Sequence, residues 1–342
     1  MRVRDGRYLC RLLSAHVHRR GLRGGEAGSG RGWVAILREG VLQRFAKELA
    51  AAGASENTVA NYRSQLKGCA RWLAQRHGWG DSCVVTLADL DEYRRNLAER
   101  CRPATVNLFV YAARAFGRWA VKQGLAATDP AAGLRCQVEG PERAPRWLTG
   151  EEQRRLVHAV QREAATVTTE HGRQRAVRDM AVLLLMLHAG LRVGEVVALR
   201  WEDVELSRRR GRVTVRAGKG GKCRQVPLNV EVRRALLRYL DVRGRGPGPV
   251  FPGAGGGGLT TRAVTGMVSR YARAAGVAAS PNVLRHTFCH ELVERGGVAL
   301  DSVAILAGHT TLDGRPNVRT TMRYAVPRER ELERAVESIE WH

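Results

Sequence analysis

The sequence has few of the features that mark exported, membrane-spanning or zinc-binding proteins. Its longest apolar run, MAVLLLML at residues 180–187, is far shorter than the roughly 18 residues of a membrane span, and no apolar signal region follows the N-terminus. The seven cysteines are scattered, with no CxxC pair and no Cys/His spacing that would hold zinc. We therefore expect a soluble, cytoplasmic protein with reduced thiols.

Acidic residues are also few compared with basic ones. The chain has 33 Asp and Glu against 57 Lys and Arg, a formal net charge of +24. Such a surplus repels itself unless a polyanion neutralises it, so nucleic acid is the expected partner. A merely basic soluble protein and a membrane-surface protein are the alternatives. The second is disfavoured because the basic residues are spread along the chain, with no polybasic run beside an apolar anchor.

At 342 residues the chain has room for two domains, each with its own core. Residues 1–33 hold eight arginines against one Asp and one Glu, and we expect a basic, flexible tail there. The tail could touch DNA nonspecifically or be an upstream translation artefact. Residues 136–146 contain two prolines and no periodic pattern, which predicts a linker before a second domain at residues 147–342.

Residues 34–135 have helical periodicity throughout, which predicts a bundle of four helices, each of about 11 to 19 residues. Helix starts are marked by Ser55, by Thr86 with Asp89, and by Pro103. Two of these helices carry a basic stripe opposite the apolar one. Such stripes suit DNA phosphates, although a charged stripe can also be an ordinary solvated face. The candidate DNA-binding residues on them are Arg63, Lys67, Arg71, Arg114 and Arg118.

In the second domain, HAGLRVGEVVAL predicts a buried helix that ends near Gly190 and a short helix that begins near Val193. Arg192 then lies at the corner between them. The free N–H groups of a helix start and the guanidinium can together hold an anion there. The alternative is that Arg192 pairs with Glu195 or Glu202 and only ties the corner together.

The segment RVTVRAGKGGKCRQVPL alternates with period two on both sides of a glycine-rich tip, which predicts a β-hairpin. Lys219 lies at the tip. Its ammonium can protonate an alkoxide leaving group, although most hairpin lysines only keep a turn solvated. Lys222 and Arg224, in the same segment, are further candidates for DNA contact.

The last third of the chain adds three side chains that could take part in catalysis. Arg285 lies in a capped helix three residues after Asn282, His309 follows a short helix, and Tyr324 comes 15 residues later. Taken singly, His309 is more typical of a half-buried histidine, and Tyr324 of an amphipathic core residue. Their joint occurrence in this order favours a functional interpretation.

The motifs GLRVGEVVAL, GKGGKCRQVPL, LRHTF, GH and the terminal RY resemble those of the tyrosine recombinases of the phage integrase and Xer-like family, over about residues 35 to 335. The resemblance implies a mainly α-helical protein with a small β-sheet. It would have an N-terminal helical, SAM-like core-binding domain and a C-terminal mixed α/β catalytic domain, forming a C-shaped clamp on double-stranded DNA. It also implies a site-specific recombinase of the integrase or transposase kind, acting as a homo-tetramer and nucleoid-associated when bound.

In a tyrosine recombinase, Tyr324 would attack a phosphodiester, form a 3′-phosphotyrosyl link and free a 5′-hydroxyl that later reverses the reaction. Arg192 and Arg285 would stabilise charge on the phosphate, Lys219 would protonate the leaving oxygen, and His309 would hydrogen-bond the phosphate or the tyrosine. Because the link conserves the bond energy, the resemblance implies no cofactor, ATP or metal. The sequence contains no P-loop, which agrees with this.

Asn282 departs from the family, which usually has His or Lys at this position. Asn can donate a hydrogen bond to a phosphate but cannot transfer a proton. If the position only donates, activity survives at a reduced level. If it accepts the tyrosine proton, cleavage falls by about 10²- to 10⁴-fold. His286, next to Arg285, is expected to point to another helix face and to be a poor substitute.

The second departure is an insertion between His309 and Tyr324, assigned to a loop at residues 312–318. A harmless surface insertion is favoured over one that misplaces Tyr324. Beyond Tyr324, the sequence predicts a C-terminal helix with one apolar side. The family resemblance implies that this side docks on a neighbouring protomer, and packing in cis is the alternative. Two alternative functions stay open: a DNA-binding protein of this fold with weakened or lost cleavage, and a DNA-relaxing enzyme of the type IB topoisomerase kind.

Overall fold

The protein is described from a computed structural model. The described residues are 37–77, 85–138, 140, 145–216, 223–244, 246–253, 255–311, 315–324 and 336–337. The chain divides into two compact units, Met1–Glu142 and Arg143–His342, and the division falls within the expected linker. The predicted basic tail, Lys219 and Lys222 lie outside the described residues, as does the predicted C-terminal helix except for residues 336–337.

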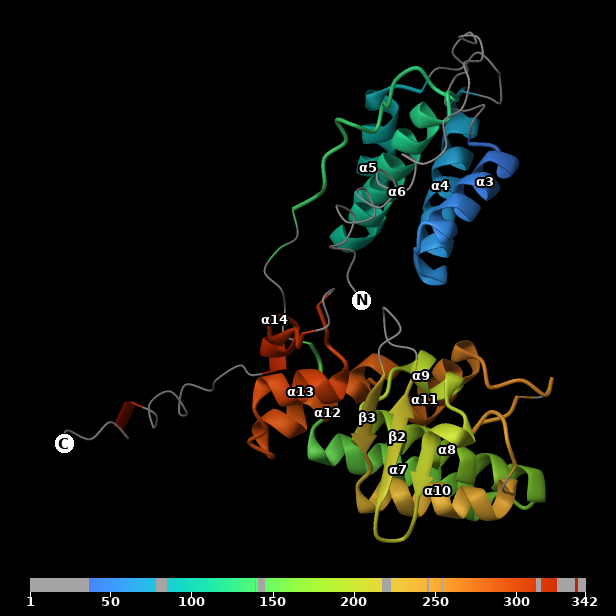
Figure 1. The fold of residues 1–342 in the computed structure, drawn as a ribbon, viewed down its shortest axis with the longest axis vertical. Coiled ribbons are helices and arrows are strands. Elements are labelled where there is room, and N and C mark those ends of the chain that lie inside the picture. The colour runs from blue at the N-terminus through green and yellow to red at the C-terminus, as the bar shows by residue number, and fades with distance from the viewer. Residues whose placement is uncertain are drawn as a thin grey trace. The chain divides into compact units, whose positions relative to one another are not determined.

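In the described residues, the first unit is a bundle of four helices (Figure 1). They are α3 (Glu39–Ala51), α4 (Glu56–His77), α5 (Leu87–Arg100) and α6 (Pro103–Lys122). Thr86 and Asp89 form a capping box, and Pro103 occupies the first turn of α6, as the sequence predicts. The helices α4 and α6 run to 22 and 20 residues, slightly longer than expected. A buried apolar face of α6 packs against α4 and α5 and forms the centre of this core.

The second unit is built around α8 (Glu170–His188), whose last eight residues before His188 are almost all buried. Its neighbours are α7 (Gly150–Thr166), α10 (Val230–Arg243) and α12 (Pro281–Glu294), which all pack against it. The remaining helical elements are α9 (Val193–Ala198), η1 (Trp201–Asp203), α11 (Thr261–Ala274), α13 (Leu300–Ala307), α14 (Val318–Thr321) and η2 (Met322–Tyr324). Within the described residues, no helix has both the length and the apolar character that crossing a membrane requires.

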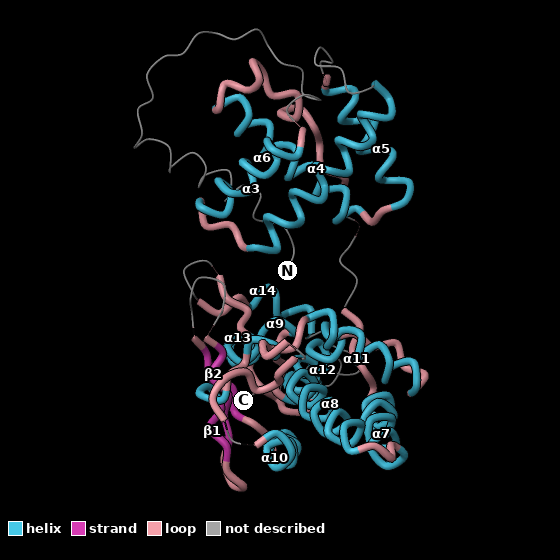
Figure 2. Tube along the Cα trace, turned by 90° about the vertical axis from the view of Figure 1, so that its right-hand side faces the viewer, coloured by secondary structure: helices cyan, strands magenta, loops and turns pink. Residues whose placement is uncertain are grey.

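A small antiparallel sheet lies along one side of these helices (Figure 2). Its strands are β1 (Val204–Leu206), β2 (Gly211–Val215) and β3 (Arg224–Pro227), in the order β1-β2-β3. The predicted hairpin is the β2–β3 pair, in which Val213 faces Val226. The strand β1 was not predicted, because it is three residues long and has no fully buried residue to produce an alternating pattern. The expected fold class, mainly α with a small sheet, is confirmed.

A minor apolar cluster joins α12, α13 and η2. It contains Phe288 and Cys289 from α12, Val303 and Ala307 from α13, and Tyr324 from η2. Tyr324 is 2% exposed, so its ring belongs to the buried core. The cluster therefore brings η2 against the helix that carries Arg285.

Candidate active site

The corner between α8 and α9 is shaped by Gly190. This residue has a φ of +64°, and a Cβ atom there would lie 2.2 Å from the ring of Phe288 on α12. Glycine alone combines that left-handed backbone with such a close approach. The corner thus lies directly against α12 and places Arg192 at the N-cap of α9, where the sequence predicts it.

Arg192 is held at this corner by two hydrogen bonds. Its Nη1 donates to Oε1 of Glu195 at 2.8 Å, and its Nη2 donates to the carbonyl of Gly308 at 2.9 Å. The pairing with Glu195 was the alternative interpretation of this corner, and it is present. The Arg192 side chain is nevertheless 42% exposed, so an anion can still approach it.

Arg224, a candidate for DNA contact from the sequence, is engaged by groups within the protein. Its Nη1 and Nη2 donate to the two oxygens of Glu195 at 2.8 and 2.7 Å, and its Nε donates to the carbonyl of Leu306 at 2.9 Å. The side chain is 11% exposed. Arg224 therefore braces Glu195 and the end of α13 from inside the protein. Because 29 residues separate Arg224 from Glu195, no local sequence pattern indicates the pair.

Glu195 is the carboxylate that holds both arginines. Burial alone raises the pKa of Glu195. Hydrogen bonds and charge attraction from Arg224, followed by the charge of Arg192, outweigh burial and bring the pKa to about 2. The group is therefore ionised in the folded protein across the physiological range, and its negative charge is matched against two guanidinium groups.

Replacing Glu195 with Gln is expected to lower the free energy of unfolding by about 3–5 kcal/mol at neutral pH, because it leaves the buried Arg224 without its charge partner. Since folding depresses the pKa of Glu195 from 4.5 to about 2, its stabilisation is complete above pH 4.5 and is lost as the pH falls toward 2. The difference between wild type and variant should shrink in that window. Urea unfolding measured at several pH values tests this.

The matched control is Glu202→Gln. Glu202 was the other candidate partner of Arg192, but it pairs with Arg200, and both side chains are exposed. An exposed pair contributes about 0–1 kcal/mol. Equal losses for the two variants, or a difference that does not change with pH, would contradict the role given to Glu195.

Arg285 ties the α8–α9 corner to the end of α13. It is 5% exposed, and its Nη1 and Nη2 donate to the carbonyls of Gly190 and Ala307. Burial, followed by the charge of Arg192, lowers the pKa of Arg285 to about 10, so it stays protonated at neutral pH. Arg192, Arg224 and Arg285 thus meet around the single carboxylate of Glu195. The surplus positive charge at this place suits a phosphate anion.

His309 follows directly after Gly308, the C-cap of α13. Gly308 closes that helix with a φ of +62°, and His309 Nδ1 then lies 3.0 Å from Oγ1 of Thr321 on α14. The imidazole is nearly parallel to the ring of Tyr324, at 12° and a centroid distance of 6.2 Å. Burial, then the charges of Arg285 and Arg192, lower the pKa of His309 to about 3, so the ring is neutral.

The insertion at residues 312–318 is closed at its base by backbone hydrogen bonds. Thr311 N donates to the Arg315 carbonyl at 2.9 Å, and Asn317 N donates to the His309 carbonyl at 2.6 Å. Asn317 then caps α14, which leads into η2 and Tyr324. Residues 312–314 lie outside the described part. The hydrogen bonds at the base of the insertion return the chain to His309. They support the interpretation that the insertion is harmless over the interpretation that it misplaces Tyr324.

Tyr324 and His286 form the contact that we did not expect. The Tyr324 hydroxyl lies 2.5 Å from Nδ1 of His286, and the two ring centroids are 5.5 Å apart. The expectation that His286 points away from the site was wrong, because η2 crosses the side of α12 that carries His286. The spacing held a usable signal. Asn282 and His286 are four residues apart, so they share one side of the helix. Asn282 itself is exposed in the first turn of α12.

The two histidines and the tyrosine are all shifted toward their neutral forms. Burial, then the charges of Arg285 and Arg323, lower the pKa of His286 to about 4. Burial also raises the pKa of Tyr324 well above its usual value of 10.0. A neutral hydroxyl thus contacts the neutral imidazole of His286, and the neutral ring of His309 lies nearly parallel to the tyrosine ring. The charges of nearby guanidinium groups act on the same hydroxyl.

The basic stripes of the first unit are partly engaged within it. Arg63 and Lys67 both pair with Glu39 of α3, the latter at 2.8 Å. Arg114 donates to the carbonyl of Leu134 and is half-buried. Arg71 and Arg118 are exposed. The solvated-face interpretation therefore fits part of the stripe on α4, and Arg71 and Arg118 are the more accessible candidates for phosphate contact.

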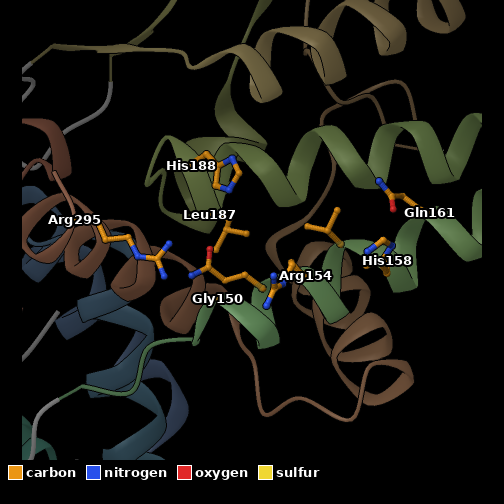
Figure 3. A pocket seen from close by; sticks show the side chains of 9 residues that line it. Gly150, Arg154, His158, Gln161, Leu187, His188 and Arg295 are labelled. Carbon is orange, nitrogen blue, oxygen red and sulfur yellow. The ribbon is translucent and has the colours of Figure 1, made fainter.

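A separate hollow opens beside α7 and the end of α8 (Figure 3). Its lining includes Arg154 and His158 of α7, His188 of α8, and Arg295. None of the described candidate catalytic residues lines it. Among the described residues, no group of three or more His, Cys, Asp or Glu side chains could hold a metal ion. The described candidate catalytic residues lie instead where α12, α13 and η2 meet.

Comparison with protein families gives two matches along the chain. Residues 146–331 match the model of the Phage integrase family, and residues 42–124 match that of the Phage integrase, N-terminal SAM-like domain. One match falls within each compact unit.

Individual proteins agree with these matches. The chain is 34% identical to the tyrosine recombinase XerC of Xanthomonas campestris pv. campestris over 75% of this chain and 76% of that protein. It is also 34% identical to the tyrosine recombinase XerD of Ralstonia nicotianae, over 84% and 90% of the two chains.

Solved structures show the same fold at lower identity. The XerH site-specific recombinase bound to its difH substrate aligns with a TM-score of 0.65 at 17% identity, covering 98% of this chain and 94% of that one. A lambda integrase dimer bound to a core site aligns with a TM-score of 0.58 at 19% identity, covering 79% and 94%.

Proposed function

The chain belongs to the phage integrase family of tyrosine recombinases, enzymes that cleave and rejoin DNA, and we propose that Tyr324 is the nucleophile of its active site. The observation that carries the proposal is the position of the Tyr324 hydroxyl, beside His286 and His309 and next to the cluster of Arg192 and Arg285. This arrangement offers a nucleophile, neutral proton partners and an anion-binding group in one place.

The proposed reaction is a transesterification in two stages. The Tyr324 oxygen attacks a phosphodiester phosphorus, a Tyr324 O–P bond forms, and the bond to the 5′ oxygen breaks. A 5′-hydroxyl of a partner strand then attacks the phosphotyrosine and releases Tyr324. Arg192 and Arg285 would hold the non-bridging oxygens and stabilise the charge that develops on them. His309 would hydrogen-bond the phosphate through Nε2, since Nδ1 is engaged with Thr321.

Lys219 and Asn282 complete the proposed set. Lys219, outside the described residues, would protonate the leaving 5′ oxygen. Asn282, exposed at the start of α12, would donate a hydrogen bond to the phosphate. We further propose double-stranded DNA carrying a specific recombination site as the substrate, with a homo-tetramer joining two such sites. The relatives named above are recombinases or integrases, so they lend no support to a topoisomerase-like enzyme or to a protein without cleavage.

A nicked suicide substrate tests the proposal. The cognate site is first identified by sequencing DNA that the purified protein retains from a random library. A nick just beyond the scissile phosphate then lets the short 5′-hydroxyl strand diffuse away, so cleavage accumulates as covalent protein–DNA complex. The proposed function predicts a complex that survives denaturing electrophoresis. If the wild-type protein forms no covalent complex with DNA on its cognate site, the proposed function is wrong.

Arg71 provides a test of the core-binding domain. Arg71→Ala is expected to weaken binding similarly for all DNA sequences and to reduce the slope of log affinity against log salt concentration by about 1, the value for one lost phosphate contact. Fluorescence anisotropy over a salt series measures the slope. The control is Arg95→Ala on α5, an exposed arginine paired with Asp91 outside the stripe. An unchanged slope for Arg71→Ala would remove it from the DNA interface.

A further inference from the structure

The contact between Tyr324 and His286 has no counterpart in the roles assigned so far. The Tyr324 hydroxyl lies 2.5 Å from Nδ1 of His286, which is a hydrogen bond between the attacking atom and a group able to take its proton. His309, the other histidine of the site, is already engaged through Nδ1 with Thr321. Of the two imidazoles, His286 is therefore the one in direct contact with the reacting oxygen.

The position of His286 on α12 explains how it can act beside Asn282. The two residues are one helical turn apart on the same side, so both can face a phosphate bound near Arg285. An amide at residue 282 can bind that phosphate but has no site that accepts a proton at neutral pH. The chain thus places an imidazole one turn further along, where η2 brings the tyrosine to it.

Resting on the proposed function, we propose that His286 is a catalytic residue that accepts the Tyr324 proton through Nδ1 as the tyrosine attacks DNA. The proton moves from the Tyr324 hydroxyl to Nδ1 while the O–P bond forms, and a separate donor, Lys219 in the proposed mechanism, protonates the leaving 5′ oxygen. His286 becomes an imidazolium and returns the proton to Tyr324 when the phosphotyrosine is resolved. No further reactant is required.

The charges around the histidine make this step depend on bound DNA. In the unbound protein, burial and the cations Arg285 and Arg323 lower the pKa of His286 to about 4, which keeps the imidazole neutral. In the neutral tautomer with its proton on Nε2, Nδ1 can accept the hydrogen bond of the Tyr324 hydroxyl. A phosphate held by Arg192 and Arg285 supplies negative charge beside these cations and so stabilises the imidazolium. The histidine therefore becomes more basic when the substrate is in place, and the tyrosine is not activated without DNA.

Two substitutions separate proton transfer from positioning. His286→Gln keeps a side chain whose oxygen can accept a hydrogen bond from Tyr324, but it cannot take up the proton. His286→Ala removes both functions. We expect both variants to lower the rate of covalent capture on the suicide substrate by about 10²- to 10⁴-fold, the usual scale of acid–base help. A near wild-type rate for His286→Gln would show that the residue only positions Tyr324, and faster cleavage by His286→Ala would show that it restrains the tyrosine. Either result overturns the proposal.

A substrate with sulfur in place of the bridging 5′ oxygen assigns the proton. The thiolate leaves without protonation, so this substrate bypasses the leaving-group donor and leaves the activation of Tyr324 unchanged. His286→Gln should be equally defective on both substrates, whereas Lys219→Ala should recover on the sulfur substrate. Recovery of His286→Gln on the sulfur substrate would assign His286 to the leaving group and contradict the inference.

Asn282→His provides a gain-of-function test on the same side of α12. In the His286→Ala background, Asn282→His is expected to raise the cleavage rate at least tenfold, because it supplies a new side chain that can accept the tyrosine proton. A large gain in the wild-type background would mean that His286 does not accept the proton.

His290→Gln is the matched control. His290 lies on the same helix, one turn beyond His286, where its ring stacks on Trp147 at 4.0 Å. It should leave the cleavage rate per folded protein unchanged, with thermal unfolding and DNA anisotropy used to correct all variants for folding and binding. The proposed function fails if wild type forms no covalent complex. The role of His286 fails separately, if wild type forms the complex and His286→Gln matches it.

Discussion

Tyr324→Phe is expected to abolish covalent capture of DNA on the nicked substrate while leaving DNA binding intact. Only the hydroxyl can form the bond to phosphorus, so the rate should fall on the order of 10⁶-fold, the scale seen when an enzyme loses its nucleophile. The ring itself packs against Phe288, Cys289, Val303 and Ala307, and Phe preserves that packing. Loss of the hydrogen bond to His286 should change stability by about 1 kcal/mol.

A fair comparison for this variant is another tyrosine-to-phenylalanine change. Tyr239 is buried and stacks on Phe251 far from the site, so Tyr239→Phe should keep full covalent capture. Denaturing electrophoresis of both variants, with binding measured by anisotropy, gives the result. A covalent complex formed by Tyr324→Phe would mean that a different residue attacks the DNA.

Arg285→Ala is expected to produce the second-largest loss. A buried guanidinium directed at a transferring phosphate contributes about 10³- to 10⁵-fold to rate in comparable phosphoryl-transfer enzymes. The same change leaves the carbonyls of Gly190 and Ala307 without their donor, which should cost on the order of 2 kcal/mol of folding stability. Single-turnover cleavage and urea unfolding, measured on the same samples, separate the two effects.

Arg285→Lys makes this prediction sharper. Lysine keeps the positive charge but cannot donate to both carbonyls and both phosphate oxygens in the planar geometry of a guanidinium. We expect it to regain part of the stability and little of the rate. The control is Arg295→Ala at the end of α12, an exposed arginine whose surface pair with the half-buried Glu291 should contribute about 1 kcal/mol or less. Near wild-type cleavage by either Arg285 variant would remove it from the active site.

Much of the architecture could be predicted because its signals are local. The capping box of Thr86 and Asp89, the hairpin of β2 and β3 and the corner at Arg192 each depend on residues within a few positions of one another. The order of Arg192, Arg285, His309 and Tyr324 was sufficient to indicate the family and its chemistry. The strand β1 escaped prediction because three residues without a buried side chain carry no periodic pattern.

The amino-acid sequence by itself determined the fold class and the family, and it indicated every candidate catalytic residue except His286. Only the tertiary structure decided which of them touch. It paired Arg224 with Glu195 across 29 residues, and it brought the Tyr324 hydroxyl to His286 across 38. Local periodicity identifies neither pair of partners, because each contact depends on where separate elements pack. His286, which its position next to Arg285 seemed to exclude from the site, is therefore the residue in contact with Tyr324.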